Sequence, residues 1–155
     1  MAKSHLVLGL AAWVAAAPLL HLPPYDPLCL ACAALGALLP DVDHPKSAVG
    51  QRVWPVSAAI ASVLGHRGIT HSAVAVAVLA LVLAQVGWHR ATVAALVVGY
   101  GSHLGADMLT PQGLRLWWPL KRTWGLPLCR TGSVAEALVV GLLCGAAGWA
   151  AHARL

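Results

Sequence analysis

The sequence contains eight histidines but only five acidic residues, and most of them fall in short motifs. Asp41, Asp43 and His44 follow one apolar stretch, whereas His103 and Asp107 lie within another. His103 and Asp107 are four residues apart, so on a helix they share one face. Imidazole and carboxylate together suit Zn²⁺, Mn²⁺ or Fe²⁺. These residue types and spacings therefore predict a site for a divalent transition metal.

Further candidate ligands lie at the ends of other apolar stretches. His5 lies near the N-terminus, and His66 and His71 flank a segment that contains Gly68. Gly68 permits a turn that brings both imidazoles to one point. The number of candidates exceeds the three or four ligands of a single site, so we expect one or two ions. The complete set of predicted ligands is His5, Asp41, Asp43, His44, His66, His71, His103 and Asp107.

The composition places these residues in a membrane protein. Of the 155 residues, 59% are hydrophobic and only 10% are charged, and the mean hydropathy is +0.76. Soluble domains usually carry about a quarter charged residues. This composition excludes intrinsic disorder, a basic nucleic-acid-binding domain and most soluble enzymes. In a membrane protein, the net charge of +5 marks the cytoplasmic face rather than a nucleic-acid partner.

The apolar stretches predict an all-α fold, a polytopic membrane helix bundle that forms a single integral membrane domain over residues 1–155. A helix over 55–64 would be only about 15 Å long, half of a bilayer core, and is predicted to be re-entrant or interfacial. Residues 1–20 resemble a signal peptide, but an uncleaved first helix is the simpler interpretation. The expected transmembrane helices, about five, are 6–22, 28–39, 72–86, 91–109 and 134–151.

The basic residues give the orientation of this bundle. With the N-terminus in the cytoplasm, eight of the ten Lys and Arg fall on the inner side, which agrees with the positive-inside rule. The same threading places five histidines and four acids at one depth on the inner side, including Glu136 at the start of the last span. Ionisable groups at membrane depth are costly and are functional by default. The sequence thus predicts a site toward the cytoplasmic face.

Other conspicuous residues have simpler interpretations. His21, His89 and His152 fall on the outer side and are interpreted as interfacial residues. Cys29 and Cys32 are interpreted as small apolar side chains within a helix rather than as a redox or zinc motif. Glycine pairs spaced four apart permit close helix packing. Two such pairs occur, Gly101 with Gly105 and Gly141 with Gly145.

Three motifs, LLPDVDHP (38–45), GHRGITHS (65–72) and GSHLGADMLTPQG (101–113), resemble those of the YdjM-like family. These are LexA-regulated, membrane-bound metal-dependent hydrolases of the bacterial inner membrane. The motifs follow the family's order and extend over most of the chain. The resemblance implies a multi-pass inner-membrane protein with a His/Asp metal centre and hydrolase activity. The matching positions are His5, Asp41, Asp43, His44, His66, Arg67, His71, His103 and Asp107.

The predicted chemistry is metal-assisted hydrolysis, in which one or two divalent ions activate a water molecule. Zn²⁺ is the leading candidate for the metal, and Mn²⁺ and Fe²⁺ are the alternatives. Asp43 or Glu136 is the candidate general base. Arg67 is the candidate for binding a phosphoryl oxygen and stabilising developing negative charge. Both Glu136 and Arg67 have alternative roles, Glu136 at a helix N-terminus and Arg67 as a cytoplasmic anchor.

The loop 110–133 indicates the substrate. It mixes aromatic and basic residues, and tryptophan prefers the headgroup region whereas Lys and Arg attract anionic lipid. We therefore expect a phospholipid or another amphipathic phosphoester at the cytoplasmic leaflet and no nucleic-acid partner, with the oligomeric state left open. Two alternatives remain: a metal-ion or proton-coupled transporter or channel, and a membrane protein in which a metal only stabilises helix packing.

Overall fold

The computed structural model describes residues 2–64, 68–130 and 132–153. Within these residues the chain forms six α-helices and no β-strand, so the all-helical prediction is confirmed. Short 3-10 helices η1 (Ala17–Leu20), η2 (Leu39–Asp43) and η3 (Ile69–His71) adjoin three of them. The α-helices are α1 (Ala2–Ala16), α2 (Pro27–Leu38), α3 (Trp54–Leu64), α4 (Ala73–Gln85), α5 (Arg90–Met108) and α6 (Val134–His152).

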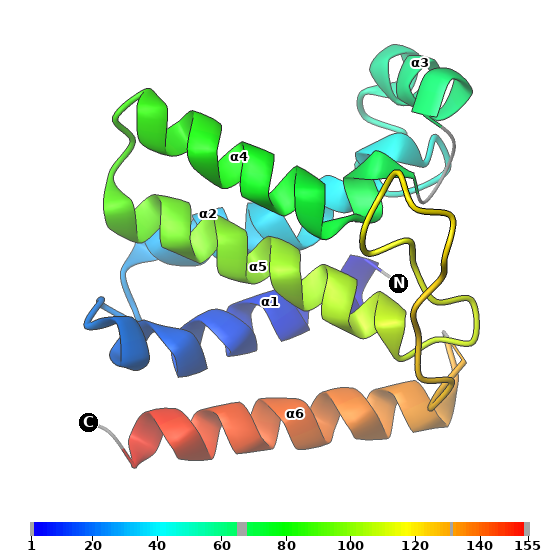
Figure 1. The fold of residues 1–155 in the computed structure, drawn as a ribbon. Helices are drawn as coiled ribbons and strands as arrows, with labels where there is room; N and C mark the ends of the chain where they lie inside the picture. The colour runs from blue at the N-terminus through cyan, green and yellow to red at the C-terminus, as the bar shows by residue number, and fades with distance from the viewer. Residues whose placement is uncertain (1, 65–67, 131, 154–155) are drawn as a thin grey trace.

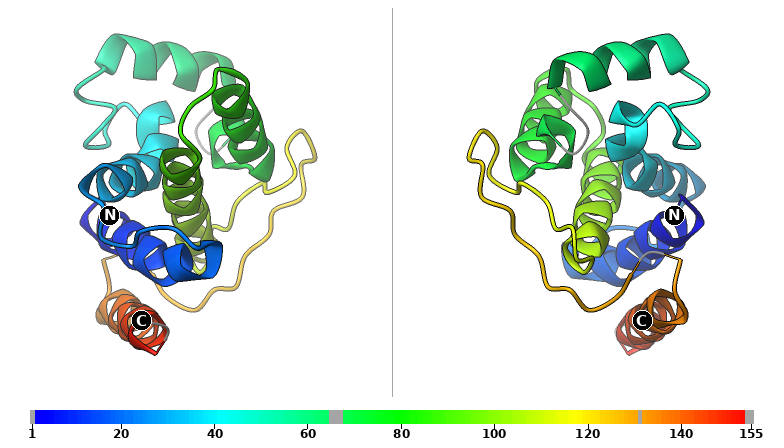
Figure 2. Two further views of the ribbon diagram at one scale, coloured as in Figure 1. Left: turned by 90° about the vertical axis from the view of Figure 1, so that its left-hand side faces the viewer. Right: turned by 90° about the vertical axis from the view of Figure 1, so that its right-hand side faces the viewer.

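Helices α1, α2, α4, α5 and α6 run with their axes in roughly one direction (Figure 1). The short helix α3, expected to be re-entrant or interfacial, lies across this direction at one end of the bundle, as Figure 2 shows. Helix α5 packs against α1, α2 and α4, and α6 packs on α1. Helix α5 is therefore the central helix of the bundle, in contact with three of the other helices.

Two segments of the described chain are long and apolar enough to cross a membrane, Ala2–Leu20 and Val134–His152. These are fewer than the five crossings that the apolar stretches predicted. Helices α2 and α4 have 12 and 13 residues, and at about 1.5 Å per residue they are shorter than a hydrocarbon core of about 30 Å. Helix α5 has 19 residues, but His103 and Asp107 lower its hydropathy.

The contact between α2 and α5 depends on two glycines. A Cβ atom on Gly36 would lie 2.1 Å from the carbonyl oxygen of Leu96, and one on Gly99 would lie 2.0 Å from the carbonyl oxygen of Ala33. Each helix thus touches the backbone of the other, which is possible only where a side chain is absent. This close approach brings the C-terminal part of α2 against the part of α5 that carries His103.

The glycines that the sequence suggested for packing lie elsewhere. A Cβ atom on any of them would meet no atom within 4 Å, so the close packing that their spacing permits is not formed among the described residues. Gly36 and Gly99, which do contact the neighbouring helix, have no glycine four residues away, so the spacing did not identify them. The four glycines are Gly101, Gly105, Gly141 and Gly145.

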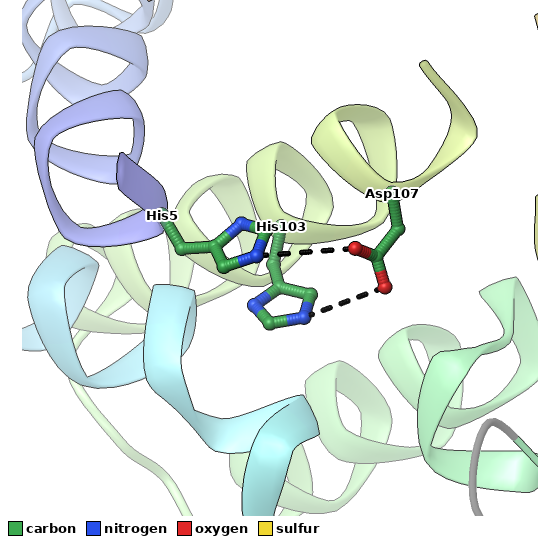
Figure 3. Close-up of side chains that lie close together, drawn as sticks. All are labelled: His5, His103 and Asp107. Atoms are coloured by element: carbon green, nitrogen blue, oxygen red, sulfur yellow. Dashed lines mark ion pairs between the residues drawn. The ribbon is translucent and has the colours of Figure 1, made fainter. Parts of the chain in front are cut away.

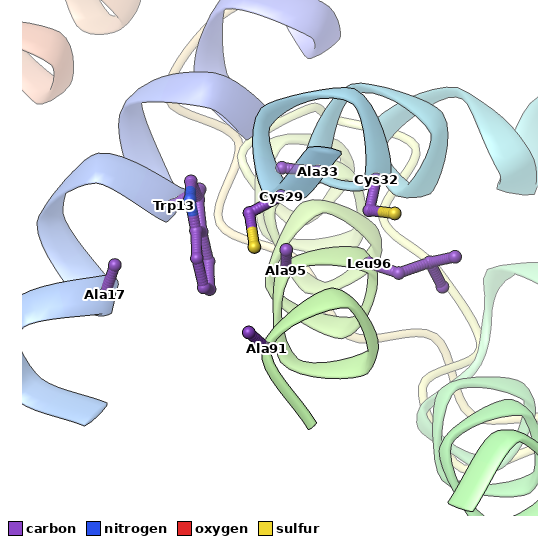
Figure 4. Packing of buried hydrophobic residues seen from close by; sticks show 8 residues of the cluster. All are labelled: Trp13, Ala17, Cys29, Cys32, Ala33, Ala91, Ala95 and Leu96. Atoms are coloured by element: carbon purple, nitrogen blue, oxygen red, sulfur yellow. The ribbon is translucent and has the colours of Figure 1, made fainter. Parts of the chain in front are cut away.

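An apolar cluster fills the bundle between α1, α2 and α5 at the end away from η2 and η3 (Figure 4). Trp13 is fully buried there, and Cys29 and Cys32 pack in the same cluster as free thiols. Large apolar side chains on the outer faces of α4 and α6, such as Leu81 and Leu142, stay exposed. Exposed apolar faces of this kind suit contact with lipid.

Candidate metal centre

Five acidic and imidazole side chains meet at one end of the bundle, although they come from four separate elements. His5 comes from the start of α1, Asp41 from η2, His71 from η3, and His103 and Asp107 from the C-terminal part of α5. The four elements converge at the end of the bundle that holds the N-terminus of α1 (Figure 1). The three imidazoles and Asp107 are buried, and the side chain of Asp41 is 16% exposed.

The carboxylate of Asp107 lies at the centre of this cluster. Its Oδ1 atom is 3.8 Å from His5 Nε2, and its Oδ2 atom is 3.8 Å from His103 Nε2 (Figure 3). Oδ2 also lies 3.5 Å from His71 Nε2, and His103 Nε2 lies 3.9 Å from Asp41 Oδ1. These separations exceed hydrogen-bond lengths. They approach the roughly 3.4 Å between two ligands of one tetrahedral zinc ion.

Two overlapping groups of three residues present ligand atoms that all lie within 4.8 Å of one another. The first group is His5, His103 and Asp107, and the second is Asp41, His71 and His103. His103 belongs to both groups, and its ring stacks on that of His5 with 3.9 Å between the centroids. The arrangement therefore offers nitrogen and oxygen donors for one ion or for two neighbouring ions.

The ring of His103 is oriented by the backbone of α2. Its Nδ1–H donates a hydrogen bond to the carbonyl oxygen of Ala37, 2.7 Å away. A carbonyl oxygen only accepts, so in the neutral ring the lone pair lies on Nε2. That Nε2 atom is buried without a hydrogen-bond partner. A buried acceptor of this kind costs free energy unless a ligand satisfies it.

The ring of His71 is oriented by a carboxylate instead. Asp43 Oδ2 lies 3.3 Å from His71 Nδ1, and the hydroxyl of Thr70 donates to the same oxygen. This contact turns the Nε2 atom of His71 toward Asp107. A carboxylate behind an imidazole is the usual support of a metal-binding histidine. Asp43, predicted as a ligand or as a base, is fully buried and lies in neither group of three.

Backbone contacts hold these elements in place. The hydroxyl of Tyr100 on α5 donates to the carbonyl oxygen of Thr70 at 2.6 Å, which fixes η3 against α5. The loop 110–133 returns to the C-terminus of α5, where the N–H groups of Leu126 and Leu128 donate to the carbonyl oxygens of Met108 and Leu109. The carbonyl groups that end a helix are thus satisfied by the loop that covers the site.

A cavity of about 320 Å³ opens beside the cluster. His44 lines it without belonging to either group of three, and Glu136 reaches it from α6. Glu136 accepts a hydrogen bond from the N–H of Gly132, and its own N–H donates to the hydroxyl of the N-cap residue Ser133. This is a variant of the capping box, in which the carboxylate accepts from the residue before the N-cap. The alternative role of Glu136 at a helix N-terminus is therefore present in the structure, together with its place on the cavity wall.

The structure does not place the remaining histidines or Arg67 in the His/Asp cluster. His66 and Arg67 lie outside the described residues, so their roles as metal ligand and phosphoryl-binding group stay predictions. His21, His89 and His152, interpreted as interfacial, are exposed.

Sequence reasoning missed two supports of the site. Thr70 adjoins His71 in its motif, and a search for hydroxyl groups beside each candidate ligand would have found it. Cys129, which lines the cavity, comes from a loop without any metal-binding spacing.

A helical bundle with exposed apolar faces and a buried His/Asp cluster defines a class, that of membrane proteins with a candidate metal centre between their helices. Within this class the chain belongs to the YdjM family, because the family model described as YdjM inner membrane protein matches residues 1–155. It is accordingly a membrane protein, as its composition predicted.

The chain is also similar to proteins from three bacteria. The chain is 50% identical over 101 residues to the Inner membrane protein YdjM of Escherichia coli (strain K12), covering 62% of this chain and 52% of the relative, and the figures are the same for that of Shigella flexneri. The chain thus spans about half the length of these two curated relatives. It is 34% identical over 140 residues to the Uncharacterized protein YvsG of Bacillus subtilis (strain 168), covering 89% of this chain and 86% of the relative. No solved structure matches the chain.

Proposed function

We propose that this protein is a membrane-embedded, metal-dependent hydrolase that acts on a phospholipid or another amphipathic phosphoester at the cytoplasmic leaflet. The observation that carries the proposal is the buried cluster of three imidazoles and two carboxylates beside a cavity of about 320 Å³. A membrane location favours amphipathic substrates, because such molecules are concentrated at the depth where the cluster would lie.

The residues fit a divalent transition metal. Their nitrogen and oxygen donors match Zn²⁺, with Mn²⁺ or Fe²⁺ as alternatives. The buried, unpartnered Nε2 atom of His103 and the two carboxylates would otherwise be costly to desolvate. Such an ion supplies a Lewis acid that activates water and polarises a phosphoryl or carbonyl group. The residues that would hold it are His5, Asp41, His71, His103 and Asp107.

The remaining residues of the cavity supply orientation and proton transfer. Asp43 and the carbonyl oxygen of Ala37 fix the rings of His71 and His103, so that both Nε2 atoms face the cluster. Glu136 lies on the cavity wall with a carboxylate that can accept a proton. Asp43 lacks that access, because His71 stands between it and the Asp107 carboxylate. Glu136 is therefore the better candidate for the general base.

The loop 110–133 provides a rim that suits a lipid headgroup. Trp117, Lys121 and Arg122 are exposed on it, and the guanidinium of Arg122 lies 4.4 Å from the ring centroid of Trp124. Aromatic side chains prefer the interfacial region, and basic side chains attract anionic lipid. This combination supports a substrate that enters from the leaflet on the loop's side.

The proposed topology has five crossings, with the N-terminus and the loop 110–133 in the cytoplasm of a bacterium. It is supported by the eight basic residues that this threading places on one side. Reporter fusions after Arg90 and after Arg122 should report opposite sides of the inner membrane. Two fusions on the same side would contradict the topology and the depth assigned to the site.

Metal analysis and mutation test the activity. The purified protein is expected to contain about one to two transition-metal ions per chain. His71→Ala and Asp107→Ala should remove both the metal and hydrolysis of a phospholipid panel while membrane insertion persists. The matched control is His89→Ala, which changes an exposed histidine at the start of α5.

Two results would contradict the proposal. A metal-free preparation that stays folded and hydrolyses lipid would show that the hydrolysis does not depend on a metal. If the two site variants abolish metal flux into proteoliposomes and the wild-type protein hydrolyses no lipid, the chain is a transporter.

A further inference from the structure

A second cavity, of about 340 Å³, lies next to the cavity of the His/Asp cluster. The two cavities share Leu8, Ala106 and Leu109 in their walls, so they adjoin. The rest of the second wall comes from three helices, α1, α5 and α6. These residues are Ala11, Ala12, Ser102, Gly105, Leu143 and Ala147.

The second cavity extends away from the His/Asp cluster along α1 and α6, and along α5 it runs beside the stretch that carries His103 and Asp107. The lining residues run from Leu8 to Ala12 on α1, from Leu109 back to Ser102 on α5, and from Leu143 to Ala147 on α6. On each helix this direction leads from the end that holds the cluster toward the opposite end of the bundle (Figure 1). In the proposed orientation it is the direction from the headgroup region into the hydrocarbon core.

The wall of this cavity is apolar. Its one polar side chain, Ser102, donates a hydrogen bond to the carbonyl oxygen of Gly99 at 2.7 Å and so offers no free donor. A polar ligand would find only the hydroxyl oxygen of Ser102 as an acceptor, whereas a hydrocarbon chain would lose no hydrogen bond by entering. The volume is at the lower end of the roughly 300–1,000 Å³ range of ligand sites, which favours one chain over two.

We propose that the second cavity binds one acyl chain of a lipid whose headgroup lies at the His/Asp cluster. This inference rests on the proposed function, since it names how the substrate of that site is held. The junction of headgroup and chain would lie at the shared wall of Leu8, Ala106 and Leu109. A lipid held in this way leaves its phosphoester beside the candidate metal ligands.

Gly105 provides a direct way to fill the cavity. A Cβ atom there would meet nothing within 4 Å, and Gly105 lines the cavity, so Gly105→Leu directs a larger side chain toward the space that the acyl chain would occupy. Gly145→Leu on α6 is the matched control, because its Cβ atom also meets nothing within 4 Å. Gly145 is two residues from both Leu143 and Ala147, which places it about 200° around the helix from the cavity wall.

The experiment measures bound lipid directly. Protein freed of lipid in detergent is titrated with palmitoyl-oleoyl phosphatidylglycerol, and native mass spectrometry counts the lipids on each chain. We expect one tightly bound lipid on the wild-type protein and on Gly145→Leu. Gly105→Leu should bind about tenfold more weakly or worse, because each methylene group excluded from an apolar site weakens binding several-fold. Metal content and unfolding temperature, measured on the same samples, verify that each variant is folded.

The outcomes separate this inference from the proposed function. If Gly105→Leu alone loses the lipid and the wild-type protein hydrolyses it, both stand. If Gly105→Leu alone loses the lipid but the wild-type protein hydrolyses no phospholipid, the acyl-chain site stands and the hydrolase fails. If the wild-type protein hydrolyses the lipid and Gly105→Leu binds it as tightly as Gly145→Leu does, the acyl-chain site is overturned and the hydrolase stands.

Discussion

The backbone contact between α2 and α5 gives a quantitative prediction for one added methyl group. Gly99→Ala would place a Cβ atom 2.0 Å from the carbonyl oxygen of Ala33, whereas real Cβ atoms do not approach closer than 3.0 Å. Neither partner is the end of a flexible side chain, so the two helices must part by about 1 Å in a densely packed region. Gly101→Ala, on the same helix, adds the same methyl group where nothing lies within 4 Å.

The two substitutions should change stability in opposite directions. Overpacking of this kind typically costs about 1–3 kcal/mol. Replacing glycine by alanine within a helix contributes up to about 1 kcal/mol of stabilisation, which Gly101→Ala alone should show without a clash. Equilibrium unfolding in detergent, followed by circular dichroism, is expected to place Gly99→Ala below the wild-type protein and Gly101→Ala at or above it.

The same displacement should reach the candidate metal centre. The hydrogen bond from His103 Nδ1 to the carbonyl oxygen of Ala37 is 2.7 Å long. Parting the helices by about 1 Å would take it beyond hydrogen-bonding range. Loss of such a support typically costs about 10–100-fold in metal affinity, measurable by competition with a chelating dye. If Gly99→Ala equals Gly101→Ala in both stability and metal affinity, the packing argument is refuted.

Three further changes test the site and its supports. Chelation of the purified protein should lower its unfolding temperature, and added Zn²⁺ should restore it, because a ligand that binds only the folded state stabilises that state; an unchanged temperature would argue against a bound metal. Asp43→Ala should weaken metal affinity about 10–100-fold in the same dye competition, because Asp43 orients His71; wild-type affinity would contradict that role. Asp26 caps α2 by accepting a hydrogen bond from the N–H of Cys29 at 2.8 Å, which holds the pKa of its carboxyl below the usual value. Its contribution to stability is therefore present above the unfolded-state pKa and is lost as the pH falls through the folded-state pKa. The difference in unfolding temperature between the wild-type protein and Asp26→Ala should shrink on acidification, and a difference independent of pH would contradict the cap.

The helices could be predicted because residues close in sequence determine where each helix begins and ends. Asp26 and Pro27 mark the start of α2, and the hydroxyl of Ser72 accepts a hydrogen bond from the N–H of Ala75 at the start of α4. The convergence of the polar motifs followed from the same limits. Once the helices are threaded back and forth, the polar residues at their inner ends must lie at one end of the bundle.

The finer roles could not be predicted, because they depend on the path of the backbone. Asp41 and Asp43 are two residues apart on the 3-10 helix η2, where they point in directions about 240° apart. One carboxylate therefore faces His103, and the other lies behind His71. The partner of His103 Nδ1 is the carbonyl oxygen of Ala37, which every residue type carries and which no motif can reveal.

Helix α5 shows why the apolarity of a segment understates its capacity to cross a membrane. At 19 residues it is about 29 Å long, which matches a hydrocarbon core. Its hydropathy is lowered by His103 and Asp107, whose exposed fractions are only 1% and 5%. Hydropathy counts such side chains as though lipid tails surrounded them, but these face α1, η2 and η3 inside the bundle. His103 and Asp107, the residues that make α5 part of the candidate site, are thus also the ones that lower its mean hydropathy. Because both are buried between helices, this polar face supports the crossing that we propose for α5.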